Sequence, residues 1–206
     1  MTGKFITLEG IEGVGKSTHL RFVASWLREQ GHSVVVTREP GGTPIAEQIR
    51  SVILKESTDK LPPLAELLLM FAARAAHLET LIRPALSRGE WVVCDRFVDA
   101  SYAYQGAGRG LSMEVIEKLE AIVQQGLRPD LTILLDVPLG VSSRRRARRD
   151  HRDRFEREQD PFFERVQAAY REIAAREPER VRTVLSDRPV EEVQADIAAI
   201  MSNFVQ

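Results

Sequence analysis

Cysteine is almost absent from this sequence, which has a single one, Cys94, in 206 residues. One cysteine cannot form a disulfide within the chain, so we expect no disulfide to support the fold. Cys94 lies in the apolar run 91–94, where a buried and unreactive thiol is the simpler interpretation. This cysteine usage agrees with a reducing compartment, and we expect a cytoplasmic protein.

Long apolar runs are missing as well. No window approaches the roughly 18 unbroken apolar residues that a membrane span needs, and the amino terminus shows no basic segment followed by an apolar stretch. The net charge is only −1, which argues against a general nucleic-acid binder. We therefore expect neither a membrane nor a nucleic acid as a partner.

Apolar, β-branched runs alternate with stretches of helical periodicity along the chain. The expected strands are 5–8, 34–37, 91–93, 131–135 and 181–185. The expected helices begin near residue 18 and then cover 64–86 (as one helix or a broken pair, with Pro84 and Gly89 marking its end), 112–124, 139–148, 161–175 and 190–204. This order predicts an α/β fold in which helices flank a five-stranded parallel sheet in three layers, as one domain over residues 1–206.

The most informative motif follows the first expected strand. Glycines there would let backbone N–H groups curl around polyphosphate oxygens, and the next helix would offer its positive end. Lys16 adds a mobile charge and Ser17 a hydroxyl suited to Mg²⁺. The motif reads Gly10, Ile11, Glu12, Gly13, Val14, Gly15, Lys16, Ser17, with Thr18 next. It predicts a nucleotide site of the P-loop NTPase type.

Polar residues also follow the later strands, where ligands of open parallel sheets gather. We expect loops at 38–43, 95–105 and from 136 onward to share the site with the phosphate loop. Asp95 could hold Mg²⁺ or orient an acceptor, and Arg96 could bind phosphate, although a salt-bridged turn is an alternative. Arg74, on an apolar helix, needs a partner, which is either a ligand or a protein carboxylate.

Residues 144–157 contain eight arginines. A solvated helix face, an RNA-binding arm and a mobile flap are the three interpretations. Phe155 is the only aromatic residue available for base stacking. We favour a flap, or lid, because an arginine delivered to a moving phosphoryl group accelerates its transfer by about 10³ to 10⁵.

Taken together, these residues resemble the bacterial thymidylate kinases over nearly the whole chain. The similarity is carried by several segments in order: 8–10, Glu12 within the phosphate loop, 38–43, 71–74, 95–97, 104–106 and 153–156. The resemblance implies transfer of the γ-phosphoryl group of ATP to thymidine 5′-monophosphate (dTMP), giving dTDP and ADP in dTTP synthesis. It also implies Mg²⁺ as cofactor and a homodimer built from apolar helix faces, which could include 67–81.

The resemblance assigns roles to individual residues. Arg96 and Arg38 would hold the acceptor phosphate, Arg74 would reach the thymine carbonyl, and Tyr104 would crowd a 2′-hydroxyl. The implied dTMP-binding set is Glu12, Arg38, Glu39, Pro40 (expected in the cis form), Arg50, Met70, Phe71, Arg74, Arg96, Ser101, Tyr104 and Gln105. Ser17 and Asp95 would serve Mg²⁺, partly through water.

Two comparisons with the family leave alternatives open. Many relatives place an aromatic residue where this chain has Met70, so either Met70 or Phe71 stacks on the base. Some relatives carry a catalytic arginine at the position of Gly13, and here that charge would come from the lid. The implied catalytic set is Lys16, Asp95, Arg96, Arg149, Glu12, Arg145 and Arg154, while Arg145 and Arg188 would join residues 10–18 in binding ATP.

Two other functions compete with this interpretation. Another deoxynucleoside or nucleoside monophosphate kinase would share the scaffold and differ only in its acceptor. A nucleotide-binding switch or regulatory ATPase would need a partner in place of a small acceptor. Tight binding of thymidine nucleotides would exclude a pure switch.

Overall fold

The computed structural model describes residues 3–55, 61–147 and 153–205, and it has five parallel strands in one sheet. The strand order is β2-β3-β1-β4-β5. The strands are β1 (Phe5–Glu9), β2 (Val34–Arg38), β3 (Trp91–Asp95), β4 (Leu131–Asp136) and β5 (Val181–Leu185). All five expected strands are therefore confirmed. The apolar runs form strands because helices cover both faces of the sheet and bury them.

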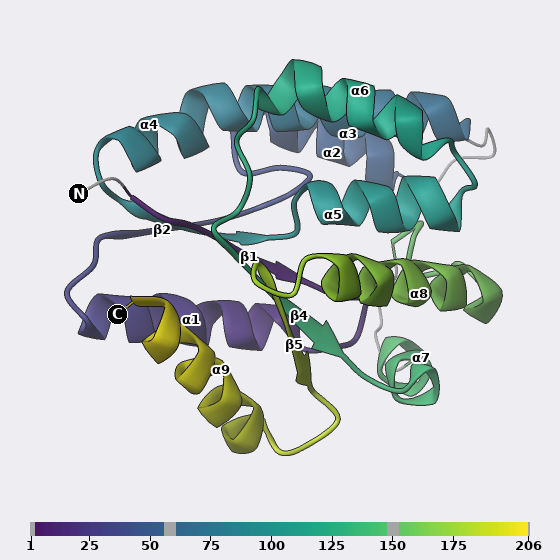
Figure 1. Ribbon diagram of the computed structural model, residues 1–206. Helices are drawn as coiled ribbons and strands as arrows, with labels where there is room; N and C mark the ends of the chain where they lie inside the picture. The colour runs from purple at the N-terminus through teal and green to yellow at the C-terminus, as the bar shows by residue number, and fades with distance from the viewer. Residues whose placement is uncertain (1–2, 56–60, 148–152, 206) are drawn as a thin grey trace.

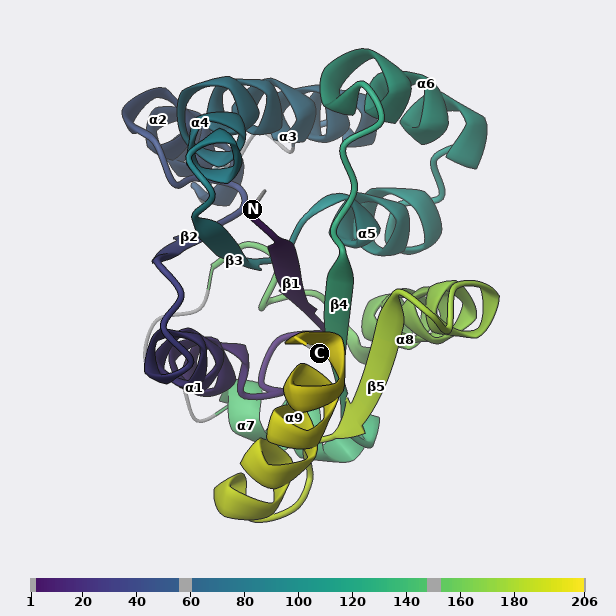
Figure 2. The same ribbon diagram turned by 60° about the vertical axis from the view of Figure 1, so that its left-hand side comes forward.

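Helices form the outer layers (Figure 1). They are α1 (Lys16–Glu29), α2 (Pro44–Leu54), α3 (Pro63–His77), η1 (Leu78–Ile82), α4 (Arg83–Ser87), α5 (Val98–Ser101), η2 (Tyr102–Gly108), α6 (Met113–Gln124), α7 (Leu139–Ala147), α8 (Asp160–Arg176) and α9 (Val190–Val205). Helices α1 and α9 lie on one face, while α3 to α6 and α8 lie on the other (Figure 2). None of these helices is both long and apolar enough to cross a membrane.

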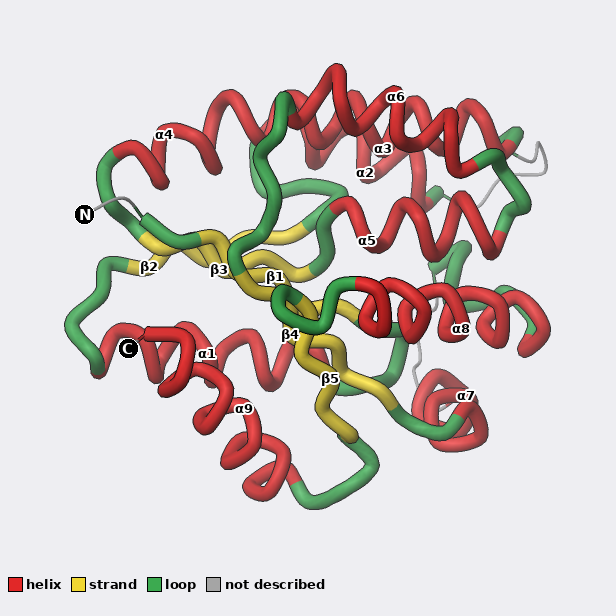
Figure 3. The backbone as a smooth tube through the Cα atoms, in the orientation of Figure 1, coloured by secondary structure: helices red, strands yellow, loops and turns green. Residues whose placement is uncertain are grey.

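The structure corrects several local expectations. The stretch 95–105 is not a loop throughout, because α5 and the π-helical η2 occupy 98–108. Helix α2 was not expected at all. The expected helix over 64–86 is confirmed by α3, η1 and α4, which together run from Pro63 to Ser87, although Pro84 lies inside this run and not at its end. The π-helical turn η1 joins α3 to α4, and the tube view shows this run as a continuous red helix (Figure 3).

The register of the sheet places the functional loops together. Leu8 of β1 pairs with Asp95 of β3, and Arg38 of β2 also pairs with Asp95. The carboxyl ends of β1, β2 and β3 therefore meet at one edge, where the phosphate loop, residues 39–43 and residues 96–97 begin. Thr7 and Thr132 share a buried hydrogen bond of 2.7 Å between their hydroxyls, which ties β4 to β1 behind this edge.

Candidate active site

The phosphate loop runs between β1 and α1 and has a backbone that only glycine adopts easily. Gly10 has a φ of 130°, and a Cβ there would lie 2.3 Å from the Leu135 carbonyl oxygen. Gly15 has a φ of 95° and caps the amino end of α1. This geometry leaves no room for a side chain at Gly10 and directs the start of α1 toward the loop.

Lys16 lies across this loop. Its ammonium donates hydrogen bonds to the carbonyl oxygens of Gly10 (3.0 Å) and Ile11 (3.2 Å). Burial and the neighbouring Arg96 lower the pKa of Lys16 to about 8. A bound polyphosphate would oppose both effects, because its negative charge favours the ammonium form.

A groove beside the loop contains both residues expected to bind a metal, Ser17 and Asp95. Arg38 and Arg50 also line this groove. The Oδ1 atom of Asp95 is buried and has no hydrogen-bond partner among the described residues. One carboxylate and one hydroxyl fit Mg²⁺, which keeps several waters and takes other ligands from phosphates. The described residues include no cluster of three His, Cys, Asp or Glu side chains that could hold a metal without a nucleotide.

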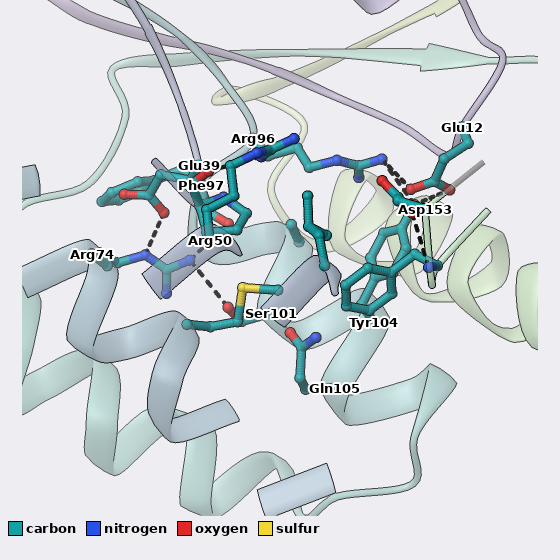
Figure 4. Close-up of a pocket in the computed structure, with 15 residues that line it drawn as sticks. Glu12, Glu39, Arg50, Arg74, Arg96, Phe97, Ser101, Tyr104, Gln105 and Asp153 are labelled. Atoms are coloured by element: carbon teal, nitrogen blue, oxygen red, sulfur yellow. Dashed lines mark hydrogen bonds and ion pairs between the residues drawn. The ribbon is translucent and has the colours of Figure 1, made fainter. Parts of the chain in front are cut away.

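A separate cavity opens next to the loop, bounded by α2, α3, α5 and η2 and by residues 153–155 (Figure 4). It is lined by Glu12, Glu39, Pro40, Arg50, Leu54, Met70, Arg74, Arg96, Phe97, Ala100, Ser101, Tyr104, Gln105, Asp153 and Phe155. Ten of the twelve residues expected to bind dTMP are among them. The cavity thus brings together residues that follow β1, β2 and β3 and are distant in sequence.

Arg74 crosses one end of this cavity (Figure 4). Its guanidinium is buried and donates to Glu39 Oε2 (2.7 Å), to the Phe97 carbonyl (3.1 Å) and to Ser101 Oγ (3.1 Å). It also lies 4.6 Å from the ring centroid of Phe71. Its Nη1 atom is buried and has no partner within the described structure. A protein carboxylate therefore neutralises Arg74, while one donor remains for a ligand.

His77 of α3 holds the Glu39 carboxylate in place. His77 Nδ1 lies 3.1 Å from Glu39 Oε1, and its Nε2 lies 2.7 Å from the Thr37 hydroxyl. The bond between Glu39 and Pro40 is cis, as expected. Arg50 of α2 donates to the Pro40 carbonyl at 2.8 Å. These contacts connect β2, α2 and α3 around the carboxylate that holds Arg74.

Arg96 stands at the other end, beside the phosphate loop. It donates to Glu12 Oε1 (2.9 Å) and to the Tyr104 hydroxyl (2.9 Å), and Tyr104 donates to Glu12 Oε2 (2.6 Å). Burial would raise the pKa of Glu12, but the charges of Arg96 and Lys16 outweigh it and lower that pKa below its ordinary value. Glu12 is therefore an ionised carboxylate between the loop and the cavity.

A third groove lies on the far side of the loop. It is lined by Gly13, Val14, Gly15, Thr18, His19, Arg145, Ser186, Arg188 and Val190. Arg145 donates to the Gly13 carbonyl at 3.1 Å, and Ser142 of the same helix donates to the Glu12 carbonyl at 2.7 Å. Arg188 forms ion pairs with Asp196 and Glu192 at the rim. Helix α7 thus packs directly on the loop that it was expected to serve.

Some expected residues lie elsewhere. Phe71 is buried under Arg74 and does not line the cavity, whereas Met70 does. Arg38 lines the Ser17 groove and is ion-paired with Glu47. Arg154 donates to Glu66 Oε2 (2.7 Å) and to the Ile53 carbonyl (3.0 Å), so this structure does not bring it to the phosphate loop. Arg149 lies outside the described residues.

Four residues that the sequence did not single out complete the site. Glu9 and Tyr170 contact each other beneath Arg96, and His77 holds Glu39. Glu66 is fully buried and accepts bonds from Gln105 (2.8 Å) and Arg154. A carboxylate on an apolar helix, such as Glu66, is a signal that could have been used, because it must find cationic partners.

Comparisons with known proteins agree with this geometry. The sequence model of the family described as thymidylate kinase matches residues 8–197. A thymidylate kinase of Chromohalobacter salexigens is 59% identical over 96% of this chain and 94% of its own. One of Teredinibacter turnerae is 51% identical over 100% of both chains. The crystal structure of thymidylate kinase from Ehrlichia chaffeensis superposes with a TM-score of 0.80 at 30% identity and covers 98% of this chain and 100% of that one.

Proposed function

The chain belongs to the thymidylate kinase family, and we propose that it transfers the γ-phosphoryl group of ATP to dTMP, giving dTDP and ADP for dTTP synthesis. The observation that carries this proposal is the cavity beside the phosphate loop. It has Arg74 with an unpartnered buried Nη1 at one end and Arg96 at the other. That arrangement suits a ligand with a carbonyl-bearing base and a phosphate.

The base end would read thymine by hydrogen bonds. Arg74 Nη1 would donate to a thymine carbonyl, with Ser101 and Gln105 near the base edge. Met70 would contact the base face, because it lines the cavity and Phe71 does not. Tyr104 would limit space for a ribonucleotide. Its hydroxyl is held by Arg96 and Glu12, so the ring cannot turn aside without breaking two bonds.

The phosphate end would bring donor and acceptor together. Arg96 and Arg50 face the acceptor phosphate, and Arg38 stands across the adjoining groove. Glu12 would lie near the 3′-hydroxyl. The loop amides, Lys16 and Thr18 would hold the donor phosphates, and Arg145 and Arg188 would flank the donor nucleoside. Catalysis would rest on alignment and charge neutralisation, because the loose transition state asks little of a base.

Ser17 and Asp95 would hold Mg²⁺ with the phosphates, and the ion would neutralise charge on the β- and γ-phosphate oxygens. Arg145, of the arginine-rich segment expected to form a lid, donates a hydrogen bond to the Gly13 carbonyl of the phosphate loop. We propose Arg145 as the residue that supplies the charge missing at Gly13. Arg149 and Arg154 stay predictions for the catalytic set. Arg154 would first have to break its bond to Glu66 in order to reach the phosphate loop.

We also propose that the enzyme is a homodimer. Leu67 and Leu78 of the expected interface are buried in the chain's own core. On α3 and the neighbouring α2, the exposed large apolar side chains are instead Leu64 (50%), Leu68 (49%), Ile45 (59%) and Val52 (56%). These helices form an outer layer (Figure 1). Light scattering should give twice the monomer mass, and Leu68→Glu should reduce it. A monomeric wild type would contradict this.

The cytoplasmic location stays a prediction from cysteine usage.

A substrate panel tests the function. With ATP and Mg²⁺, dTMP should be phosphorylated fastest, dUMP about 10- to 200-fold more slowly and dCMP by about 10⁴. A methyl pocket discriminates weakly, whereas a mispaired polar edge leaves buried donors without partners. Lys16→Met should abolish turnover while the circular-dichroism spectrum is retained. If dCMP outpaced dUMP, the role of Arg74 would be wrong. If no monophosphate were phosphorylated, a switch ATPase would be favoured.

A further inference from the structure

The turn that carries Arg96 has an unusual backbone. Arg96 has a φ of 72°, in the left-handed region that a side chain other than glycine rarely adopts. Its own N–H bonds to the Leu8 carbonyl at 3.0 Å, and the next N–H, of Phe97, donates to Glu9 Oε1 at 2.6 Å. Glu9 is fully buried at the end of β1. The buried carboxyl group of Glu9 therefore holds the left-handed turn in place.

The second oxygen of Glu9 has a different partner. Tyr170 reaches it from α8, and the two oxygens lie 2.7 Å apart. The same Tyr170 hydroxyl accepts a hydrogen bond from Arg96 Nη1 at 3.1 Å. Glu9 thus fixes the backbone of Arg96 through Phe97 and the guanidinium of Arg96 through Tyr170. Arg96 is therefore restrained both at its backbone and at the guanidinium end of its side chain.

We propose that Tyr170, oriented by Glu9, is a positioning residue that aims the Arg96 guanidinium at the phosphate of the acceptor. This proposal rests on the proposed function, in which that phosphate lies against Arg96. Within the described residues, the other side-chain hydrogen bonds of Arg96 go to Glu12 and Tyr104, from its Nη2 atom. An incoming phosphate would compete with Glu12 for this guanidinium. Tyr170 is neutral and stands on the other nitrogen, so its contact can persist when the phosphate binds.

The geometry explains why such a contact matters. An arginine side chain has several rotatable bonds and loses entropy when it is fixed. Tyr170 is buried, and its ring packs against Tyr104 at a centroid distance of 6.3 Å. Its hydroxyl therefore has a fixed place from which to receive Nη1. Without that hydroxyl, Nη1 would lose its fixed partner, and once the acceptor phosphate displaced Glu12 the guanidinium would be less well oriented toward it.

Tyr170→Phe tests the proposal by removing only the hydroxyl. We expect the dissociation constant for dTMP, measured by titration calorimetry, to rise about 10- to 100-fold, which is the range for a lost hydrogen bond to a charged group. Thymidine has no phosphate, so its dissociation constant should change less than twofold. The KM for ATP should also stay within twofold, because the loop holds ATP.

Tyr102→Phe is the matched control. It also loses a tyrosine hydroxyl bonded to a glutamate, Glu120, at 2.5 Å, but between η2 and α6, away from the cavity. Its affinities should equal those of the wild type. Glu9→Ala is the second variant; it removes both contacts of the Glu9 carboxyl group and should weaken dTMP binding selectively as well. Thermal melting establishes that each variant is folded.

Three results would overturn the proposal. Tyr170→Phe could bind dTMP as tightly as the wild type. It could lose affinity for thymidine as much as for dTMP, which would indicate a general loss of structure in the cavity. Tyr102→Phe could show the same selective loss. Failure of the proposed function looks different, since the wild type itself would then not phosphorylate dTMP.

Discussion

Replacing Arg74 by methionine should destabilise the protein strongly. Arg74 and Glu39 form a buried ion pair in which their side chains are 3% and 5% exposed. In Arg74→Met the apolar stem keeps packing on Phe71, but the Glu39 carboxylate loses its cationic partner. Among the side chains in the described structure that bond to Glu39, only His77 then remains. A buried carboxylate without its counter-charge is costly, since the interior solvates it poorly.

The magnitude follows from measured pairs of this kind. Breaking a buried pair on one side costs about 3–5 kcal/mol. For a chain of this size, each kcal/mol shifts the melting temperature by about 2–4 °C, so the expected decrease is roughly 6–20 °C. Removing both charges, in Arg74→Met with Glu39→Gln, should recover most of the loss, because no unpaired charge stays buried.

Urea unfolding of the wild type, both single variants and the double variant measures the coupling between the two residues. The free energies of unfolding should differ from additivity by about 2 kcal/mol or more. Lys118→Met is a suitable control, because Lys118 pairs with Glu114 on the exposed face of α6 and such pairs contribute about 0–1 kcal/mol. If Arg74→Met cost less than 1 kcal/mol, or if the double variant were the sum of the singles, the buried pair would not explain how Arg74 is held.

Three further predictions concern the loop and its surroundings. Because burial and Arg96 lower the pKa of Lys16 to about 8, binding of an ATP analogue at pH 8 should take up about half a proton, seen as a buffer-dependent heat, and equal heats in all buffers would contradict this. Burial and the nearby Asp99 raise the pKa of Glu9 from 4.5 to about 8, so the folded state holds an extra proton and the free energy of unfolding should fall as the pH rises through this window. Glu9→Gln should lack that slope in urea titrations, and an unchanged slope would count against the assignment. Gly42→Ala should lower the melting temperature more than Gly110→Ala, because both have positive φ but only at Gly42 would a Cβ meet Thr37 Oγ1 at 2.3 Å.

Local patterns predicted the strands well and the connections poorly. Each strand is an apolar run bounded by polar or glycine-rich residues. A few consecutive residues are therefore enough to predict that the segment is a buried strand. Helices α5 and η2 were missed because Gly106 and Gly108 lie in a segment that looks like a loop, yet both glycines lie against other side chains, Met113 and Phe162. Close packing from distant elements, which no local pattern records, makes this stretch helical.

The same limit applies to the site. The phosphate loop could be predicted because its function depends on backbone geometry within eight consecutive residues. Met70 and Phe71 could not be separated, because adjacent helix positions differ by about 100° and the sequence does not say which one faces the cavity. Glu9 and Tyr170 are 161 positions apart. Their pairing is decided by how α8 packs on the sheet, and neither residue carries a local sign of it.

Two of the arginines that line the cavity are held in the same way, which bears on how substrates bind. Arg74 is paired with Glu39 and Arg96 with Glu12. Each cation is therefore neutralised and oriented before a substrate arrives, so little ordering is left for the binding step. Arg74 keeps Nη1 unpartnered in the described structure, and it can meet a neutral carbonyl without giving up Glu39. Arg96 uses Nη1 for Tyr170 and Nη2 for Glu12 and Tyr104, so an acceptor phosphate must compete with Glu12. Base binding should consequently depend little on ionic strength, whereas phosphate binding should weaken as salt rises.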